Sequence, residues 1–498
     1  MHAAAVFFVR AYADALDILE RWSRLLLLLV IALLAPTWVT QITADRLTGD
    51  EVANARMAVN LAHHGVISHD NGPSPLETMY REPVPPVTAA AFVWLADAKL
   101  GEAPTDAYLS GERAQYLKYH HVFWKALAVA GTHALIVALG APPVAGLAGA
   151  LLVGTRRDID SLTTELEAGA LLVVASAALV AGLRRRRVAP LVLAGVLFGL
   201  TALTKAAALY VFAGLLAALA AVLWLMPTDD GHRETPRRIF VAVAALTVGF
   251  AVVTLPWMHR NYVKLDSFQI SSRAGIVLFL RATKNQMSWD EFKGAFYVWS
   301  RPELKPLLGA LTGYDEADLA VGGKLQRLNR KADGEFARID LEAELAGEPE
   351  KALTFYRRAR AERVRLVAEY SARLEPRAAE LEADRELARR ALDAIVDEPF
   401  RHLAMSLPLT WRGAHVYLPV LLLLLGYAYK TRRRELLLVA LLCAGFIAFH
   451  SLFSHFEPRY SVPLKGTIGA LLIAAFVDAW RLLRTRIEVG RLTSRLAS

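Results

Sequence analysis

The sequence predicts an all-α polytopic membrane protein with about ten transmembrane helices. Two observations predict this class. Hydrophobic residues make up 55% of the 498 residues, and the mean hydropathy is +0.33. Leu- and Ala-rich runs, each near the length that spans a bilayer, recur along most of the chain. This composition excludes a mainly disordered or collagen-like protein, and the single Cys443 excludes an internal disulfide.

The first apolar run extends from Arg24 to about Ile42 and follows a short basic start. The peptide 42–44 weakly resembles the processing site of a cleaved signal peptide, so cleavage stays open. We favour an uncleaved anchor, because the run is long enough to cross the membrane. The remaining spans are expected at 120–140, 142–155, 165–183, 188–204, 206–226, 239–258, 406–429, 435–453 and 462–481.

Basic residues predict the orientation of these helices, because short cytoplasmic loops are enriched in Lys and Arg. Clusters follow the spans that end at 183, 429 and 481, and another precedes the span that begins at 239. Counted from a cytoplasmic N-terminus, all of these clusters and the C-terminus lie in the cytoplasm. The short run 142–155 could instead be re-entrant. The net charge of +9 is then a property of membrane anchors and does not predict nucleic-acid binding.

This topology leaves two large segments outside, at about 43–119 and 259–405. The first is expected to form interfacial helices over 45–118. In the second, residues 315–398 are rich in Ala, Glu, Arg and Leu and predict amphipathic helices near 355–374 and 377–396. We interpret them as a solvated hairpin, with a lid over a binding site as the alternative.

Three domains follow from this topology. They are an N-terminal membrane module at 1–258, a helical outer insertion at 259–405, and C-terminal membrane helices with a basic tail at 406–498. The first module includes the outer loop at 43–119. The sequence contains no internal repeat and no Pro-rich linker that would divide the chain further.

Charged side chains gather on the outer side of this topology, and charges near membrane depth are costly and often functional. They come from loops far apart in the sequence: Asp50 and Glu51; Arg81 and Glu82; Asp158, Asp160 and Glu165; Lys205; Arg260; and Glu457 and Arg459, next to Tyr460. Lys205, Arg260 and Arg459 oppose the inside bias for positive charge. An anionic ligand at the outer interface would explain them.

Several of these residues also have a structural interpretation. Asp50 and Glu51 could begin a solvated helix, because acidic residues favour first turns. Lys205 could extend its amine to the interface. Structural roles are also open to the remaining residues: a helix cap for Asp158 and Asp160, an ion pair with Glu82 or Glu77 for Arg81, and an ion pair with Glu457 for Arg459.

Two pairs of adjacent histidines, His63–His64 and His120–His121, are candidate metal ligands by residue type. Neighbouring residues point to different sides of a helix, so neither pair predicts a metal site. The sequence therefore leaves the metal ligands unknown and no cofactor certain, with a divalent metal still compatible with the outer acids.

Motifs in the outer segments resemble a known family. Gly49-Asp50-Glu51 after the first span, then the peptides 60–65 and 81–86, resemble the first outer loop of glycosyltransferases with the GT-C fold. The segments 255–262, 394–403 and 457–463 resemble later pieces of the same family. The sequence is similar to the dolichyl-phosphate-mannose protein mannosyltransferases and to their bacterial relatives, the aminoarabinose and galacturonosyl transferases. It departs from them at 84–86, where Val-Pro-Pro stands in place of the frequent Gly-Tyr-Pro.

The resemblance implies a multi-pass glycosyltransferase of the bacterial inner membrane, with a periplasmic active site and cytoplasmic termini. It implies a polyprenyl-phosphate sugar donor and a lipid, glycan or protein acceptor among membrane lipids, and no nucleic-acid partner. Asp50 would take the proton of the acceptor hydroxyl in a direct displacement. Glu51, the second candidate catalytic residue, would point elsewhere on the helix and could orient a partner or a metal. The remaining implied roles are donor phosphate binding for Arg81, Lys205 and Arg459, and substrate or acceptor binding for Asp158, Asp160, Glu82, Arg260 and Tyr460.

Three rival functions stay open at this point. A transporter or flippase for a lipid-linked sugar would predict paired, Gly- or Pro-interrupted half-helices in two repeats, and the sequence has no such symmetry. A glycan ligase or polymerase of related architecture would differ mainly in a larger donor. A non-catalytic assembly protein would use the helices at 315–398 to dock partners.

Overall fold

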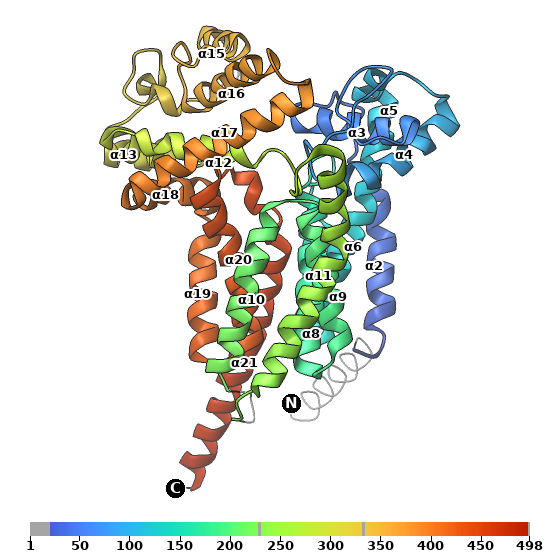
Figure 1. Cartoon of the computed structure of the whole chain (residues 1–498). Coiled ribbons are helices and arrows are strands. Elements are labelled where there is room, and N and C mark those ends of the chain that lie inside the picture. The colour runs from blue at the N-terminus through green and yellow to red at the C-terminus, as the bar shows by residue number, and fades with distance from the viewer. Residues whose placement is uncertain (1–19, 228–230, 331–333, 497–498) are drawn as a thin grey trace.

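The computed structural model describes residues 20–227, 231–330 and 334–496, with side chains to Ile487 (Figure 1). Within these ranges the chain is helical and has no strand. The chain is an integral membrane protein, and its long apolar helices form a bundle beneath a layer of shorter helices. The first 19 residues, and with them the expected cytoplasmic N-terminus, lie outside the described residues.

Among the described residues, six helices are long and apolar enough to cross a membrane, and a bent pair raises the number to seven if it is one span. The six include α6 (His120–Ala138, continuing α5, Gly111–Lys118), α8 (Glu165–Arg185), α10 (Ala207–Leu225), α11 (Pro236–Leu265), α20 (Arg434–Phe453) and α21 (Leu464–Leu496). Three shorter apolar helices are α2 (Ser23–Val39), α7 (Pro143–Gly154) and α9 (Val188–Ala202). Each apolar run expected from the sequence is therefore helical, but length and composition do not establish ten crossings.

The run expected as one span at 406–429 is two helices with a sharp bend between them, so it is a broken span or a re-entrant segment and not a single straight helix. α18 (Pro399–Ala414) and α19 (Tyr417–Lys430) meet at an angle of 99°. α18 is amphipathic, and its buried face contains polar groups that bond to the outer layer. Arg281 donates to the backbone oxygen of His402 at 2.6 Å and to Ser406 Oγ at 2.7 Å. These bonds hold α18 among the outer helices, so only α19 continues into the bundle (Figure 1).

Basic residues collect at one end of the bundle, as the topology predicted. Arg184, Arg433 and Arg481 donate to backbone oxygens of residues 138–140, between α6 and α7, at 2.8, 2.9 and 2.9 Å.

The outer segments lie at the opposite end (Figure 1). They comprise α3 (Asp50–His64), α4 (Val84–Leu100), η1 (Thr105–Leu109) and α5 from the first loop. The insertion supplies α12 (Ala274–Ala282), η2 (Thr283–Gln286), α13 (Trp289–Val298), α14 (Lys305–Thr312), η3 (Ala317–Leu319), η4 (Gln326–Leu328), α15 (Gly334–Ala346), α16 (Phe355–Ser371) and α17 (Pro376–Asp397).

Glycines bring two membrane helices together, whereas another pair stays apart. A Cβ on Gly195 of α9 would lie 2.2 Å from the backbone oxygen of Leu246 on α11, and one on Gly249 of α11 would lie 2.1 Å from that of Val192. Small residues allow this close packing in membranes. On α10, by contrast, a Cβ on Gly214 would meet nothing within 4 Å. The bundle is therefore tight between α9 and α11 and leaves open space beside α10.

The outer insertion forms the helices predicted near 355–374 and 377–396, as α16 and α17. α17 packs closely on α12. The Asp384 carboxylate accepts hydrogen bonds from the backbone of Gly275 at 2.8 Å and of Ile276 at 2.9 Å, which caps the start of α12. This cap fixes the position of Arg273, the residue just before α12.

Candidate functional site

A cavity of about 1130 Å³ opens at the end of the bundle that carries the layer of shorter helices. Charged and aromatic side chains line its mouth: Asp50, Arg81, Glu82, Glu165, Lys205, Arg273, Arg459 and Tyr460. Its deeper wall is apolar and is formed by α10 and α20, with Leu209, Val211, Leu215, Leu441, Ala448 and Phe449. The cavity thus joins a charged mouth to an apolar groove that follows two membrane helices.

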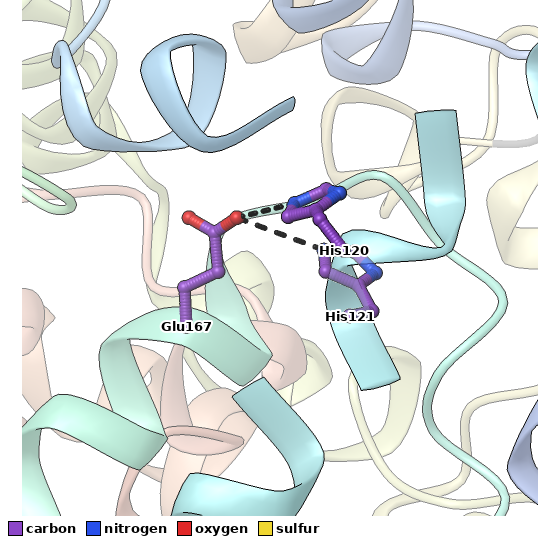
Figure 2. Close-up of side chains that lie close together, drawn as sticks. All are labelled: His120, His121 and Glu167. Carbon is purple, nitrogen blue, oxygen red and sulfur yellow. Dashed lines mark hydrogen bonds and ion pairs between the residues drawn. The ribbon is translucent and has the colours of Figure 1, made fainter. Parts of the chain in front are cut away.

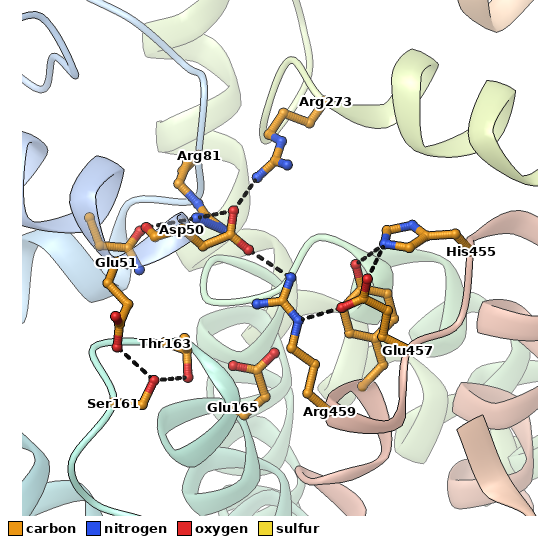
Figure 3. Close-up of polar contacts among 12 residues, drawn as sticks. Asp50, Glu51, Arg81, Ser161, Thr163, Glu165, Arg273, His455, Glu457 and Arg459 are labelled. Atoms are coloured by element: carbon orange, nitrogen blue, oxygen red, sulfur yellow. Dashed lines mark hydrogen bonds and ion pairs between the residues drawn. The ribbon is translucent and has the colours of Figure 1, made fainter. Parts of the chain in front are cut away.

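Three arginines hold the Asp50 carboxylate at this mouth (Figure 3). Oδ1 lies 3.1 Å from Arg81 Nη1 and 3.3 Å from Arg273 Nη1, and Oδ2 lies 2.8 Å from Arg459 Nη2. Asp50 is the first residue of α3, directly after Gly49, whose φ of 54° is readily adopted only by glycine. We call these four charged residues the mouth cluster.

The electrostatics of the mouth cluster keep Asp50 ionised. Burial alone would raise the pKa of its carboxyl, but the guanidinium groups of Arg81, Arg273 and Arg459 outweigh burial and hold this pKa well below its ordinary value. Burial would in turn lower the pKa of Arg459, and the nearby Tyr460 and acids raise it instead. Asp50 is therefore a stable anion and a weak base while all three arginines contact it.

A second group of contacts lies beside the mouth cluster. Lys205 Nζ is 3.1 Å from Glu165 Oε1 and lies 4.6 Å from the ring centre of Tyr460. The guanidinium of Arg459 lies 5.5 Å from the same ring. Glu82 accepts a hydrogen bond from the backbone N–H of Ala206 at 3.0 Å, at the start of α10. The predicted residues Arg81, Glu82, Lys205, Arg459 and Tyr460 therefore meet around one cavity with Asp50.

Glu51 points away from Asp50 (Figure 3). Its carboxylate accepts hydrogen bonds from Ser161 Oγ at 2.8 Å, from the backbone of Leu162 at 2.9 Å and from that of Thr48 at 3.0 Å. Consecutive residues of a helix project in different directions, which separates the two acids. Glu51 ties the start of α3 to the 155–164 loop between α7 and α8, and it does not line the cavity.

The structure does not bring Asp158, Asp160 and Arg260 to the cavity, although the resemblance implied substrate contacts for them. Asp158 pairs with Lys125 of α6. Asp160 accepts bonds from the backbone of Thr43 at 2.7 Å and from Lys118 Nζ at 3.1 Å. Arg260 Nη2 lies 2.6 Å from Glu77 Oε2. The physical reason is that each charge has a nearer partner in the helices around it.

Arg273 is a site residue that the sequence reasoning missed. It follows α11 on the side that the predicted topology places outside, so in that topology it opposes the inside bias for positive charge just as Arg260 does. The same criterion, applied to every outer cation, would have found it. Glu165 was predicted as an outer acid without a role, and it lies in the cavity wall.

The adjacent histidines His120 and His121 converge, contrary to the expectation that they point apart (Figure 2). Their ring centres are 4.2 Å apart, and both rings turn toward Glu167 of α8. Side chains about 100° apart on a helix can still meet at one carboxylate that lies between them, because the rings are long. Nothing in the local sequence pattern indicates this third group.

No family model and no curated protein matches the chain. Among solved structures, the chain is similar to the apo oligosaccharyltransferase of Archaeoglobus fulgidus, at 14% identity and a TM-score of 0.46, over 94% of this chain and 52% of that one. It is similar to the AglB protein of that organism in complex with an inhibitory peptide and a dolichol-phosphate, at 14% identity and 0.47, over 95% and 52%. It is also similar to ArnT from Cupriavidus metallidurans bound to undecaprenyl phosphate, at 14% identity and 0.33, over 90% and 76%.

The chain spans about half the length of the oligosaccharyltransferase that it matches. At 14% identity and TM-scores below 0.5, these similarities carry no conclusion about the activity of this chain.

Proposed function

We propose that this chain is a membrane glycosyltransferase that moves a sugar from a polyprenyl-phosphate donor to an envelope lipid, glycan or protein. Transfer would take place at the outer face of the bacterial inner membrane. One observation carries the proposal: a single cavity combines a cationic mouth with an apolar groove between two apolar helices, α10 and α20. A donor with a phosphorylated head and a long hydrocarbon tail requires both parts.

The apolar groove suits the tail of such a donor. Leu, Ala and Gly residues of α10 and α20 form its walls, and Gly214 leaves space along α10. Moving a hydrocarbon tail from lipid into this groove gains little hydrophobic free energy, because lipid is equally apolar. The groove would therefore orient the donor, and the charged mouth would supply the affinity.

The mouth suits a phosphate. Four cations and three acids line it, Arg81, Lys205, Arg273 and Arg459 against Asp50, Glu82 and Glu165, which leaves an excess of one positive charge (4 − 3). The side chains of Arg459 and Arg273 are 38% and 28% exposed, so an anion can reach them. Arginine suits this role because its planar group binds phosphate through two parallel hydrogen bonds.

Asp50 would act as the base, and the donor would activate it. When a phosphate binds the arginines, it competes for the guanidinium groups that lower the pKa of Asp50. Asp50 then becomes a better base at the moment when the donor is present. It takes the proton of the acceptor hydroxyl, and the oxygen attacks the anomeric carbon.

The bond from the anomeric carbon to the phosphate oxygen breaks in this step, and the electron pair leaves with the lipid phosphate. The arginines stabilise the charge that grows on the phosphate, so they act more strongly in the transition state than before it. A single displacement of this kind inverts the anomeric centre. Glu51 would serve as a positioning residue, since it holds the start of α3.

The test is mass spectrometry of envelope lipids and glycans from a deletion strain that carries the wild-type gene, Asp50→Asn or no gene. We expect one sugar modification to disappear in the deletion strain, to return with wild type and to stay absent with Asp50→Asn at equal protein level. Full restoration by Asp50→Asn would remove Asp50 as the base. A lipid-linked sugar that accumulates on the cytoplasmic side of the membrane would favour a flippase instead.

A further inference from the structure

A second polar cluster is buried where α6 and α8 meet, among residues that do not line the cavity. His120 and His121 begin α6, and Glu167 lies in the first turn of α8 (Figure 2). The two histidines are 2% and 1% exposed, and the Glu167 side chain is 1% exposed. One ligand atom from each residue lies within 4.8 Å of the others.

Backbone oxygens determine which ring nitrogens are free to bind an ion. Nδ1 of His120 lies 2.6 Å from the backbone oxygen of Leu117, and Nδ1 of His121 lies 3.2 Å from that of Ile159. A carbonyl oxygen only accepts, so each Nδ1 carries the hydrogen. The Nε2 atoms then face Glu167 Oε1, at 2.7 Å and 3.8 Å. Metal-binding histidines are commonly oriented in this way, by a bond from the other ring nitrogen.

Two atoms of the cluster have no hydrogen-bond partner among the described residues, His121 Nε2 and Glu167 Oε2. Polar atoms buried this deeply are normally bonded, and an unpaired one requires an explanation. An ion pair between His120 and Glu167 explains part of the cluster. This ion pair does not give the Nε2 lone pair of His121 a hydrogen-bond partner.

We propose that His120, His121 and Glu167 form a divalent-cation site of the kind that binds Zn²⁺. Two imidazoles and one carboxylate suit Zn²⁺, whereas Mg²⁺ and Ca²⁺ prefer oxygen ligands. On binding, the ion replaces the proton shared by His120 and Glu167, and that proton leaves to solvent. Three protein ligands leave a fourth position for water.

The residues of this site do not line the cavity, so the ion would act on the helices around it and would not contact the donor. The ion would join α6 to α8 and fix His121, which bonds to Ile159 in the 155–164 loop. The same loop presents Ser161 and Leu162 to Glu51, next to Asp50. The site would therefore hold the 155–164 loop in place, and this loop holds the start of α3 through Glu51.

The test uses the full-length chain, purified in detergent, freed of any affinity tag and stripped with a chelator. After incubation with Zn²⁺ and desalting, elemental mass spectrometry should find about one Zn²⁺ per wild-type chain. Glu167→Gln keeps the side-chain shape and removes the charge, and it should weaken binding by at least about tenfold. His133→Gln is the matched control. His133 is a buried histidine of the same helix, its Nε2 also lacks a partner among the described residues, and it is not part of the cluster.

Equal uptake by wild type and Glu167→Gln would overturn the proposal, and so would loss of uptake in His133→Gln alone. If Glu167→Gln does not fold, Co²⁺ added to the stripped wild type gives an independent measurement. Visible d–d absorption without a thiolate band is expected, since the single cysteine, Cys443, is buried elsewhere in α20. Absence of that absorption would also overturn the proposal. Neither measurement depends on transferase activity.

Discussion

The mouth cluster around Asp50 and the acids of the 155–164 loop lie at the same outer end of the bundle, and both are paired with cations. The cations differ. Asp158 and Asp160 pair with Lys125 and Lys118, whose side chains are 0% and 4% exposed. Asp50 pairs with arginines at the cavity, of which Arg459 is 38% exposed. A buried ammonium cannot exchange its partner without a large desolvation cost, whereas an arginine beside a cavity can exchange a carboxylate for a ligand anion.

The largest expected effect is the loss of transfer in Asp50→Asn. Removal of a general base typically costs about 10²–10⁴-fold in rate, and the amide keeps the shape of the side chain. We expect a loss in this range, measured as the initial rate of transfer in membranes with the donor identified from the deletion strain. Asp158→Asn is the matched control and should stay within about threefold of wild type. Equal losses of transfer rate in Asp50→Asn and Asp158→Asn would show that the mouth cluster and the acids of the 155–164 loop do not differ in function.

Arg459→Ala should have the next largest effect. We expect a loss of about 10–100-fold in kcat/KM, because a charged hydrogen bond to the phosphate contributes about 1.5–3 kcal/mol. The substitution also removes a partner of Asp50. Arg459→Lys keeps the charge without the two parallel bonds and should lie between Ala and wild type. A lysine variant no better than alanine would indicate that planar geometry, and not charge, dominates at this position.

Asp158→Asn should lower stability without a matching loss of the transfer rate. It leaves Lys125, which is 0% exposed, without its partner. Breaking a fully buried pair costs about 3–5 kcal/mol, and the partial exposure of Asp158 reduces our expectation to about 1–3 kcal/mol. The measurement is the free energy of unfolding in detergent. Lys125→Met in the same background should recover part of the loss, because it removes the unpaired charge.

The low pKa of Asp50 predicts how its contribution to stability depends on pH. The arginines lower this pKa in the folded state relative to about 3.9 in the unfolded chain. The stabilisation is therefore fully present above about pH 4–5 and is lost as pH falls further, by at most about 1.4 kcal/mol per pH unit. The difference in unfolding free energy between wild type and Asp50→Asn should be constant from about pH 5 to 7 and should shrink below about pH 4. A change in this free-energy difference between about pH 5 and pH 7 would show that the pKa of Asp50 is higher than the arginine contacts predict.

The sequence predicted the helices better than the contacts between loops. Hydropathy located the apolar runs because the bilayer imposes a constraint along the chain itself. It did not predict the sharp bend within 406–429, where the polar contacts of α18 with Arg281 set the direction of that helix. Topology placed Asp50 and Arg459 at one end of the bundle, and they meet there. Arg273 reaches the same site because the segment before α12 folds back, with the backbone N–H of Ser272 bonded to the oxygen of Met79 at 2.8 Å. No local pattern encodes that contact.

The smallest expected effect concerns Arg260, an outer cation that the structure keeps away from the cavity. Its pair with Glu77 is partly exposed, at 21% and 26% for the two side chains. Such pairs contribute about 0.2–1 kcal/mol, so a double-mutant cycle of Arg260→Gln and Glu77→Gln should give a coupling energy in that range. Transfer rates should stay within about twofold of wild type, because neither residue lines the cavity. If Arg260→Gln reduced transfer as much as Arg459→Ala, charge on the outer face in general, and not contact with the cavity, would be what the donor requires.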